Sequence, residues 1–230
     1  MQTSSLILAL VLGSASAFVA PHSAPASSAL ASRNGWTPDE SAFAFGLPGT
    51  IAPVPDFDPF GFATNADLDT MVKYREAETQ HGRVAMLAAV GFLVGENYHP
   101  LFGLDGKEIL AIDSLTEVRL VFPAFFEILT AVIGILELNR AVQGFMSPKD
   151  AQEKMFKSEY YPGDVGFDPL GLKPSDPAEF ATMATKELQN GRVAMLAVAG
   201  FVAQELVDRK PILFNDFGYG DLLDASNPLY

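Results

Sequence analysis

Two nearly identical stretches of the chain combine an acid, a further polar side chain and an arginine at fixed spacing. Residues 78–88 read ETQHGRVAMLA and residues 187–197 read ELQNGRVAMLA, so the copies differ only at their second and fourth positions. Carboxylate and amide oxygens suit a hard cation such as magnesium, and imidazole is a further common metal ligand. The candidate ligands in the two copies are Glu78, His81, Glu187 and Asn190.

The glutamate and the arginine of one copy lie too far around a helix to pair with each other. Five residues turn a helix by about 500°, which leaves the two side chains roughly 140° apart. If the repeat implies a pseudo-twofold axis, two crossed helices bring Glu78 to Arg192 and Glu187 to Arg83. The glycine before each arginine allows the backbones to approach closely. One oxygen of each carboxylate can then accept from arginine while the other binds a cation.

A turn motif precedes each copy, with FDPFGF at 57–62 and FDPLGL at 167–172. The turns are offset by 167 − 57 = 110 residues and the later motifs by 187 − 78 = 109, so a unit of turn and helix occurs twice. Helices are predicted near 65–97 and 177–209. Asp176 gives the second of them a start signal, because a proline and then an acid follow it within the first turn.

A third helix is predicted over the apolar segment 115–145, with Pro123 near its start or at a kink. Glu137 and Arg140 on this helix are i, i+3 neighbours and can pair locally. A charge at the centre of a bilayer costs roughly 2.5–3.5 kcal/mol unless it is paired or ligated. The expected fold is an all-α membrane protein with three transmembrane helices, of which the first and third are crossed and related by the internal pseudo-twofold repeat.

Composition limits the classes of function. The chain carries 15 Lys+Arg against 28 Asp+Glu, a net charge of −13, which disfavours nucleic-acid binding because phosphate contacts need a basic face. It has no cysteine, which excludes disulfides, thiolate metal sites and cysteine nucleophiles. Apolar residues make up 49% of this acidic chain, which suggests charged loops around apolar helices.

The N-terminal region has the composition of a two-part targeting sequence. Residues 1–17 hold an apolar stretch followed by small residues, as in a signal peptide. Residues 18–44 begin rich in Ser and Ala and are expected to be a plastid transit peptide with a disordered N-terminus. The helical domain is then expected over 45–230. The alternative is a secreted protein with a disordered N-terminus.

The paired ExxHGRxAM and ExxNGRxAM helices, each preceded by FDPxG, resemble the chlorophyll a/b- and a/c-binding light-harvesting superfamily. The resemblance covers about residues 45–210. The presequence, with cleavage before Phe18, is similar to that of fucoxanthin chlorophyll a/c-binding proteins of red-lineage algae. The resemblance implies a light-harvesting antenna subunit, a multi-pass protein of the plastid thylakoid membrane that transfers excitation energy to a photosystem and is not an enzyme.

The resemblance also implies a ligand set. In that family the Glu and His of the first helix and the Glu, Asn and Gln of the third ligate the magnesium of chlorophyll, and the middle helix supplies a Glu-x-x-Arg pair. The matching positions here are Glu78, His81, Glu187, Asn190, Gln204, and Glu137 with Arg140. A middle-helix glutamine of the family is Leu129 here, and Glu127 is the candidate to replace it. The turn carboxylates Asp58 and Asp168 are expected near the end rings of two carotenoids, not as direct ligands.

The cofactors implied are chlorophyll a, chlorophyll c and carotenoids, including fucoxanthin and a xanthophyll-cycle pigment. The implied partners are thylakoid lipids, other antenna subunits and a photosystem core, and an oligomer is expected. A photoprotective, energy-quenching member of the same family remains an alternative. A membrane di-iron carboxylate enzyme is another, although the second copy offers Asn190 where a second histidine would be needed. A transporter built from repeated helices is a third class.

Overall fold

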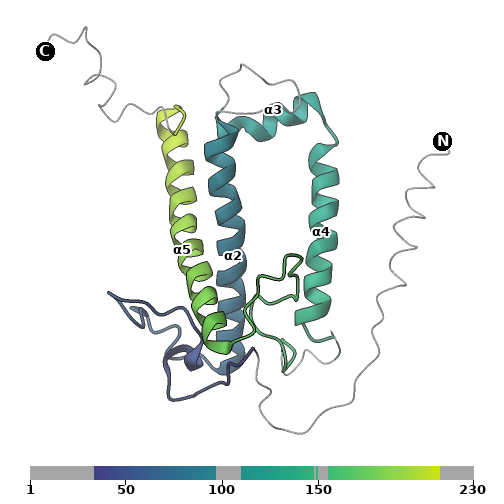
Figure 1. Ribbon diagram of the computed structural model, residues 1–230. Helices are drawn as coiled ribbons and strands as arrows, with labels where there is room; N and C mark the ends of the chain where they lie inside the picture. Colours follow the sequence, from purple (N-terminus) through teal and green to yellow (C-terminus); the bar gives the residue numbers. More distant parts are fainter. Residues whose placement is uncertain (1–33, 97–109, 148, 150–154, 213–230) are drawn as a thin grey trace, which may run out of the picture. The chain divides into compact units, whose positions relative to one another are not determined.

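The structure is a computed structural model that describes residues 34–96, 110–147, 149 and 155–212. Those residues form helices and loops without a β-strand, apart from one isolated bridge between Phe145 and Phe156. The two repeat helices are α2 (Leu68–Gly95) and α5 (Pro177–Asp208), and they lie side by side (Figure 1). They match the helices predicted over 65–97 and 177–209. At the start of α5 the Asp176 side chain accepts from Ala178 N and Glu179 N, as its cap sequence predicts.

The helix predicted over 115–145 is two helices. A short 3-10 helix, η4 (Ala111–Asp113), leads into α3 (Ser114–Val121), and α4 (Phe125–Gly144) follows. The axes of Ala111–Val121 and Phe125–Gly144 are bent by 110° from one another. Pro123 causes the break, because it lacks a backbone N–H and forces Phe122 before it out of the helical region, to φ −133° and ψ 86°.

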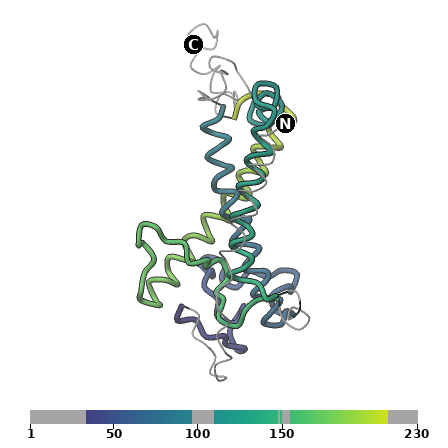
Figure 2. Tube along the Cα trace, turned by 90° about the vertical axis from the view of Figure 1, so that its right-hand side faces the viewer, coloured from purple at the N-terminus to yellow at the C-terminus, as the bar shows by residue number. Residues whose placement is uncertain are grey.

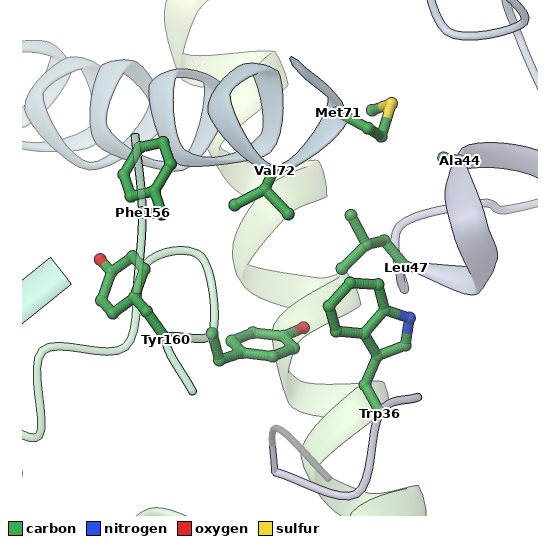
Figure 3. Packing of buried hydrophobic residues seen from close by; sticks show 8 residues of the cluster. Trp36, Ala44, Leu47, Met71, Val72, Phe156 and Tyr160 are labelled. Carbon is green, nitrogen blue, oxygen red and sulfur yellow. The ribbon is translucent and has the colours of Figure 1, made fainter. Parts of the chain in front are cut away.

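The loops before α2 and before α5 gather at one end of the helices. Residues 34–67 and 155–176 lie at this end in both views (Figures 1 and 2). They supply most of the large buried side chains, with Trp36 and Leu47 from the first loop packing toward Val72 of α2 and Tyr160 of the second (Figure 3). The cluster comprises Trp36, Ala44, Leu47, Met71, Val72, Phe156, Tyr160 and Tyr161.

The expected signal peptide and most of the expected transit segment lie outside the described residues. Residues 34–44, which the sequence assigns to a disordered N-terminus, are packed in the structure. Trp36 is buried, donates from Nε1 to Phe45 O at 2.9 Å, and meets Tyr161 edge to face at 6.2 Å between ring centroids. The short 3-10 helix η2 (Phe43–Gly46) follows it. The single tryptophan anchors this segment, which composition alone did not distinguish from the Ser/Ala-rich stretch before it.

Where α2 and α5 approach most closely the buried residues are small, and many of the large apolar ones face outward. Further along the pair Phe92 and Phe201 meet, with ring centroids 6.1 Å apart. Gly82, Ala85, Gly191 and Ala194 are buried where the helices meet. Equivalent large residues of the two copies are exposed alike, with Val84 at 66% and Val193 at 67%, and Leu87 and Leu196 both at 77%. Small residues at the contact and large apolar residues outside are typical of helices that associate in an apolar medium.

Hydropathy alone does not define the spans. Among the helices in the described part of the chain, none by itself contains an apolar window long enough to cross a membrane. Within the same described ranges, one bent pair, Ala111–Val121 with Phe125–Gly144, passes such a test together, across its 110° bend. The charged residues of the repeated motif interrupt the apolar runs of α2 and α5.

The closest approach of the two helices gives a first prediction. A Cβ atom on Gly191 would lie 2.9 Å from the Cα of Gly82, which is a backbone atom that cannot move aside cheaply. We expect Gly191→Ala to destabilise the protein by about 1–3 kcal/mol, as overpacking does elsewhere. Thermal unfolding followed by far-ultraviolet circular dichroism in detergent measures this.

The matched control for that variant is Gly200→Ala in the same helix, where an added Cβ meets no atom within 4 Å. Removing a glycine from a helix interior without a clash should leave stability unchanged or raise it by up to about 1 kcal/mol. Equal effects of the two variants would show that α2 and α5 do not meet at Gly82 and Gly191.

Candidate functional site

The two glutamates of the repeated motif form reciprocal ion pairs across the α2–α5 contact. Arg83 Nε donates to Glu187 Oε1 at 2.7 Å, and Arg192 Nε donates to Glu78 Oε1 at 2.8 Å. Both pairs expected from the five-residue spacing are thus formed. Each pair uses Oε1 of its glutamate, and Oε2 of Glu78 also lies 3.5 Å from Arg75 Nε on the same helix. A carboxylate oxygen has more than one lone pair, so each glutamate can still accept a further cation.

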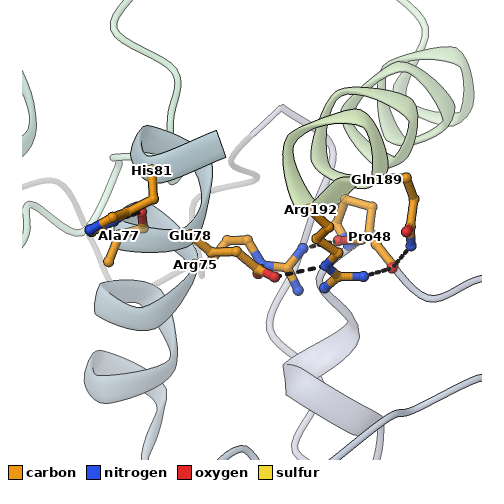
Figure 4. A network of polar contacts seen from close by, with 8 residues as sticks. Pro48, Arg75, Ala77, Glu78, His81, Gln189 and Arg192 are labelled. Carbon is orange, nitrogen blue, oxygen red and sulfur yellow. Dashed lines mark hydrogen bonds and ion pairs between the residues drawn. The ribbon is translucent and has the colours of Figure 1, made fainter. Parts of the chain in front are cut away.

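The histidine and the asparagine of the motif point away from that contact. In Figure 4 Glu78 and Arg75 are directed from α2 toward Arg192, while His81 lies on a different side of the helix. Both His81 and Asn190 are exposed. Their side chains are therefore available to a group that packs against the outside of the helix pair.

A hydrogen bond within each helix orients these two side chains in the same way. His81 Nδ1 lies 2.7 Å from Ala77 O, and Asn190 Nδ2 donates to Lys186 O at 2.8 Å. A carbonyl only accepts, so this bond places a proton on Nδ1 of His81, and in the neutral imidazole Nε2 then has the free lone pair. By the same argument Asn190 presents its Oδ1 outward. Metal-binding histidines are commonly held by such a bond from the other ring nitrogen. Both repeats therefore offer one oriented, exposed acceptor.

Glu137 and Arg140 of α4 pair as their spacing predicts. Arg140 Nη2 lies 2.8 Å from Glu137 Oε2, and the Glu137 side chain is half exposed. Arg140 also donates from Nη1 to Glu76 Oε1 of α2 at 2.7 Å, a contact that the sequence did not suggest. The middle helix is thereby joined to the first through charged side chains.

The other two candidate ligands differ in exposure, because the Glu127 side chain is 62% exposed whereas Gln204 is partly buried. Glu127, in the first turn of α4, lies 3.6 Å from Arg119 Nη2 across the bend from α3. Gln204 has its Nε2 buried without a hydrogen-bond partner among the described residues. A buried amide in that condition is costly unless a further group completes its hydrogen bonds.

The two FDPxG turns use their carboxylates internally. Asp58 accepts from the backbone N–H groups of Phe62, Ala63 and Thr64, and Asp168 accepts from those of Leu172 and Lys173. The hydrogen bond from Thr64 N is the largest of the effects that lower the pKa of Asp58, and the bond from Lys173 N is the largest that lowers that of Asp168. Both carboxylates are therefore ionised and cap their turns.

The loops close over the ion pairs from two sides. Gly49 O accepts from Gln189 Nε2 and from Arg192 Nη1, both at 2.9 Å, while Arg75 Nη1 donates to Pro48 O (Figure 4). Beside the other pair lies a cavity of about 660 Å³ between α2, α5 and the loop before α5. Its wall includes Thr79, Arg83, Tyr161, Asp168, Lys173 and Glu187.

Asp164 joins the edge of this cavity to the N-terminal segment. It accepts from Lys173 Nζ at 2.5 Å and from Asn34 Nδ2 at 2.6 Å. Burial raises the pKa of Asp164, but the hydrogen bonds from Lys173, Asn34 and Gly166 outweigh burial and leave its pKa below the ordinary value of 3.8. The carboxylate stays ionised and holds the two loops together.

A second reciprocal arrangement lies at the opposite end of the helix pair. Glu205 Oε2 accepts from Ile112 N at 2.7 Å, and Glu96 accepts from Ile212 N at 2.9 and 3.0 Å. A glutamate at the end of each helix thus accepts a hydrogen bond from a backbone N–H in the segment that follows the other helix. The sequence held a signal for this pair, since 205 − 96 = 109 is the offset of the repeat.

Comparisons with known proteins agree on one family. The family model for chlorophyll A-B binding protein matches residues 43–206. The chain is 46% identical over 178 residues to light-harvesting complex stress-related protein 1 of Chlamydomonas reinhardtii, covering 76% of this chain and 70% of that protein. It is 47% identical over 169 residues to a fucoxanthin-chlorophyll a-c binding protein of Isochrysis galbana, covering 72% and 78%. A fucoxanthin-chlorophyll a-c binding protein of Chattonella marina var. antiqua is 36% identical over 209 residues, covering 88% and 87%.

The ion pairs give the second prediction. Arg83→Leu leaves Glu187 without its partner, and the double change Arg83→Leu with Glu187→Gln removes both charges. We expect the double variant to be more stable than the sum of the two single losses predicts, with a coupling energy above about 1 kcal/mol, the upper value for solvent-exposed pairs. Each single change should cost less than the roughly 3–5 kcal/mol typical of a fully buried pair, because the two side chains are 34% and 38% exposed. Denaturation of all four proteins in detergent measures the coupling.

A matched cycle on Arg209 and Asp113 provides the control. These two side chains lie 3.4 Å apart and are more than half exposed, so their coupling should stay below about 1 kcal/mol. Strict additivity in the Arg83 and Glu187 cycle would mean that this pair contributes nothing, and the crossed-helix arrangement would have to be abandoned.

Proposed function

The chain belongs to the chlorophyll A-B binding protein family, and we propose that it is a light-harvesting antenna subunit of the plastid thylakoid membrane. It binds chlorophylls and carotenoids and passes excitation energy to a photosystem. Its work is the transfer of excitation, not bond chemistry. The protein contributes by fixing the distances, orientations and surroundings of the pigments.

One observation carries this proposal: each repeat has an exposed side chain, His81 or Asn190, with one nitrogen bonded to a carbonyl of its own helix. The other polar atom of that side chain is left to accept. Nε2 of His81 and Oδ1 of Asn190 suit the open axial position of a chlorophyll magnesium, since neutral imidazole and amide oxygen can both ligate it. The large apolar side chains around them give a macrocycle an apolar surface to pack against. The remaining ligands of the proposed set are Glu78, Glu187, Glu137, Gln204 and Glu127.

The three-span topology is part of the proposal. Helices α2, α4 and α5 each cross the membrane, with Arg83, Arg192 and Arg140 as the partners that make glutamates acceptable there. The loops 34–67 and 155–176 then share one membrane face. The second of these loops contains Lys157 and Lys173. By the positive-inside rule, the face that both loops share is therefore the one that carries the excess of basic residues.

The finer identity of the pigments follows the relatives. The Isochrysis and Chattonella proteins are named for fucoxanthin and chlorophylls a and c, so we propose chlorophyll a, chlorophyll c, fucoxanthin and a xanthophyll-cycle carotenoid here. Other antenna subunits, a photosystem core and thylakoid lipids are the proposed partners, and an oligomer is the proposed assembly. Pigment extraction and the absorption spectrum of the purified protein test this. A colourless, fully folded protein would refute the function, and bound iron without magnesium would favour a di-iron enzyme.

A quenching role is the second candidate, since the 46% identity to a stress-related light-harvesting protein lies between the 47% and 36% identities to the two fucoxanthin proteins. The fluorescence lifetime of the purified pigment complex separates the two roles. A long chlorophyll lifetime supports excitation transfer to a photosystem, whereas a short one under all conditions supports quenching.

The third prediction concerns His81 and Asn190. Replacing either by leucine should remove about one chlorophyll per protein and leave the helices intact, because only the ligand is lost. The exchange variant His81→Asn with Asn190→His keeps one acceptor at each site and should keep the pigment content. Reconstitution of the full chain with pigments, followed by extraction, gives the counts.

The control for those variants is Thr182→Val. Thr182 makes the same kind of bond, from Oγ1 to Ala178 O at 3.0 Å, but is not a proposed ligand. The Thr182→Val substitution should therefore leave the pigment count unchanged. A wild-type count in His81→Leu would refute the ligand role of His81.

The fourth prediction concerns the mature N-terminus. We propose that residues 1–17 are removed as a signal peptide and that a second cleavage then falls before Asn34. Cleavage beyond Trp36 would remove a buried side chain and the bond from Asn34 to Asp164. N-terminal sequencing of the protein isolated from plastids measures the site. A mature chain that begins at Met1, at Phe18 or after Trp36 would contradict the proposal.

A further inference from the structure

Glu76 is a buried carboxylate that the repeated motif does not include. It lies two residues before Glu78 and is only 3% exposed. Its Oε1 accepts from Arg140 Nη1 at 2.7 Å, and its Oε2 accepts from Tyr160 OH at 2.9 Å and from Gly163 N at 2.5 Å. A single side chain of α2 therefore holds α4 and the loop before α5.

The second repeat has no equivalent of this carboxylate. The position offset by 109 residues is Thr185, whose Oγ1 donates to Ala181 O within α5. The glutamate and the arginine of the motif recur in both copies, whereas Glu76 occurs in the first copy alone. Its contact with Arg140 joins the first repeat helix to α4, the long helix that has no repeat partner.

Helix packing does not fix the orientation of α4. Among the described residues, α4 makes no extended packing against α2 or α5, and its large side chains are exposed around the helix (Figure 1). Ile135, Leu136 and Leu138, three residues that project in different directions, are each more than 60% exposed. The last turns of α4 are held by Arg140, by Gly144 under the ring of Tyr160, and by bonds from Lys157 to the carbonyls of Val142 and Gly144. Of these contacts, only that of Arg140 reaches α2 and so bears on the direction of α4 relative to it.

Arg140 connects this attachment to a proposed ligand. Its Nε and Nη2 both lie 2.8 Å from Glu137 Oε2, while its Nη1 reaches Glu76. A guanidinium is planar and rigid, so holding one edge fixes the direction of the other. Both of these bonds reach Oε2 of Glu137, so its orientation depends on Arg140.

We propose that Glu76 is a positioning residue that acts through Arg140 to fix α4 and to aim Glu137 at the magnesium of a chlorophyll between α4 and the helix pair. This inference rests on the proposed function, because Glu137 is a ligand only in a pigment protein. Residues that orient metal ligands in this way typically change affinity for the metal by roughly 10–100-fold when they are replaced.

Only a carboxylate satisfies the three donors that surround Glu76. Burial, followed by the neighbouring Glu76 carboxylate, raises the pKa of Tyr160, so the tyrosine hydroxyl remains protonated and donates. Glutamine offers one oxygen and one NH₂ group, so its NH₂ must face either Arg140 or the Gly163 N–H. One donor then loses its acceptor in a buried site, and the attachment of α4 weakens. Glu76→Gln is for this reason the most conservative variant that tests the proposal.

The fifth prediction is a count of pigments. In the full chain reconstituted with chlorophylls and carotenoids, Glu76→Gln should lose about one chlorophyll, through a roughly 10–100-fold weaker site. The absorption component lost should be the one missing in Glu137→Leu. The double variant, Glu76→Gln with Glu137→Leu, should lose no more pigment than Glu137→Leu alone, since both changes act on one site. Thr185→Val, at the equivalent place in the other repeat, is the matched control and should retain every pigment.

A distance measurement tests the attachment of α4 directly. The chain has no cysteine, so Leu87→Cys on α2 and Val132→Cys on α4 carry the only spin labels. Val132 lies eight residues before Arg140, about 12 Å along the helix, where a change of direction is amplified. The distribution of distances between the two labels should be narrow in the labelled protein that keeps Glu76 and in its Thr185→Val variant. It should be broad or shifted in the Glu76→Gln variant.

The two arms separate failure of this inference from failure of the proposed function. A Glu76→Gln protein that melts earlier but keeps its pigment count and its label distance would show that Glu76 only stabilises, and the inference would be overturned. If Glu137→Leu itself loses no pigment, Glu137 is not a ligand and the positioning role falls with it. If the wild-type chain binds no pigment at all, the proposed function is wrong.

Discussion

The contact of two backbones at Gly82 and Gly191 is the constraint on which the rest of the structure depends. A Cβ on either glycine would lie about 3 Å from the other, so the helices meet there without side chains between them. This proximity lets an arginine on each helix reach a glutamate on the other at 2.7 and 2.8 Å. Four charges that would oppose insertion into an apolar medium become two pairs. Because small residues occupy the contact, Val84, Leu87 and their equivalents in α5 are turned outward.

The same contact determines which polar side-chain atoms are available to bind a metal. The glutamates and arginines are directed inward, while the histidine and the asparagine, about 60° further around each helix, are exposed. Their bonds to Ala77 O and Lys186 O turn one acceptor atom of each away from the helix. The ion pairs and the outward acceptors thus come from one stretch of sequence that serves structure on one face of the helix and ligation on another.

Pseudo-symmetry in this protein extends to the ends of the helices and is then broken in one direction. The exchange of backbone N–H groups between Glu96 and Glu205 repeats the reciprocal pattern of the ion pairs at the far end. The buried Glu76 has no counterpart, and it joins the pair to a helix that packs against neither member along its length. A symmetrical pair gives a stable frame, while a third helix needs its own attachment if its ligand is to be placed.

The sequence by itself determined the repeat, the two long helices and both reciprocal ion pairs, because a five-residue spacing within one helix leaves the charges no local partner. It also determined the pair of Glu137 and Arg140, whose spacing is local. Tertiary structure decided the rest. The break at Pro123 became a 110° bend because the chain must reverse between α2 and α4. The packing of Trp36 and the three bonds of Glu76 join segments between 64 and 125 residues apart, and no local periodicity records contacts over such separations.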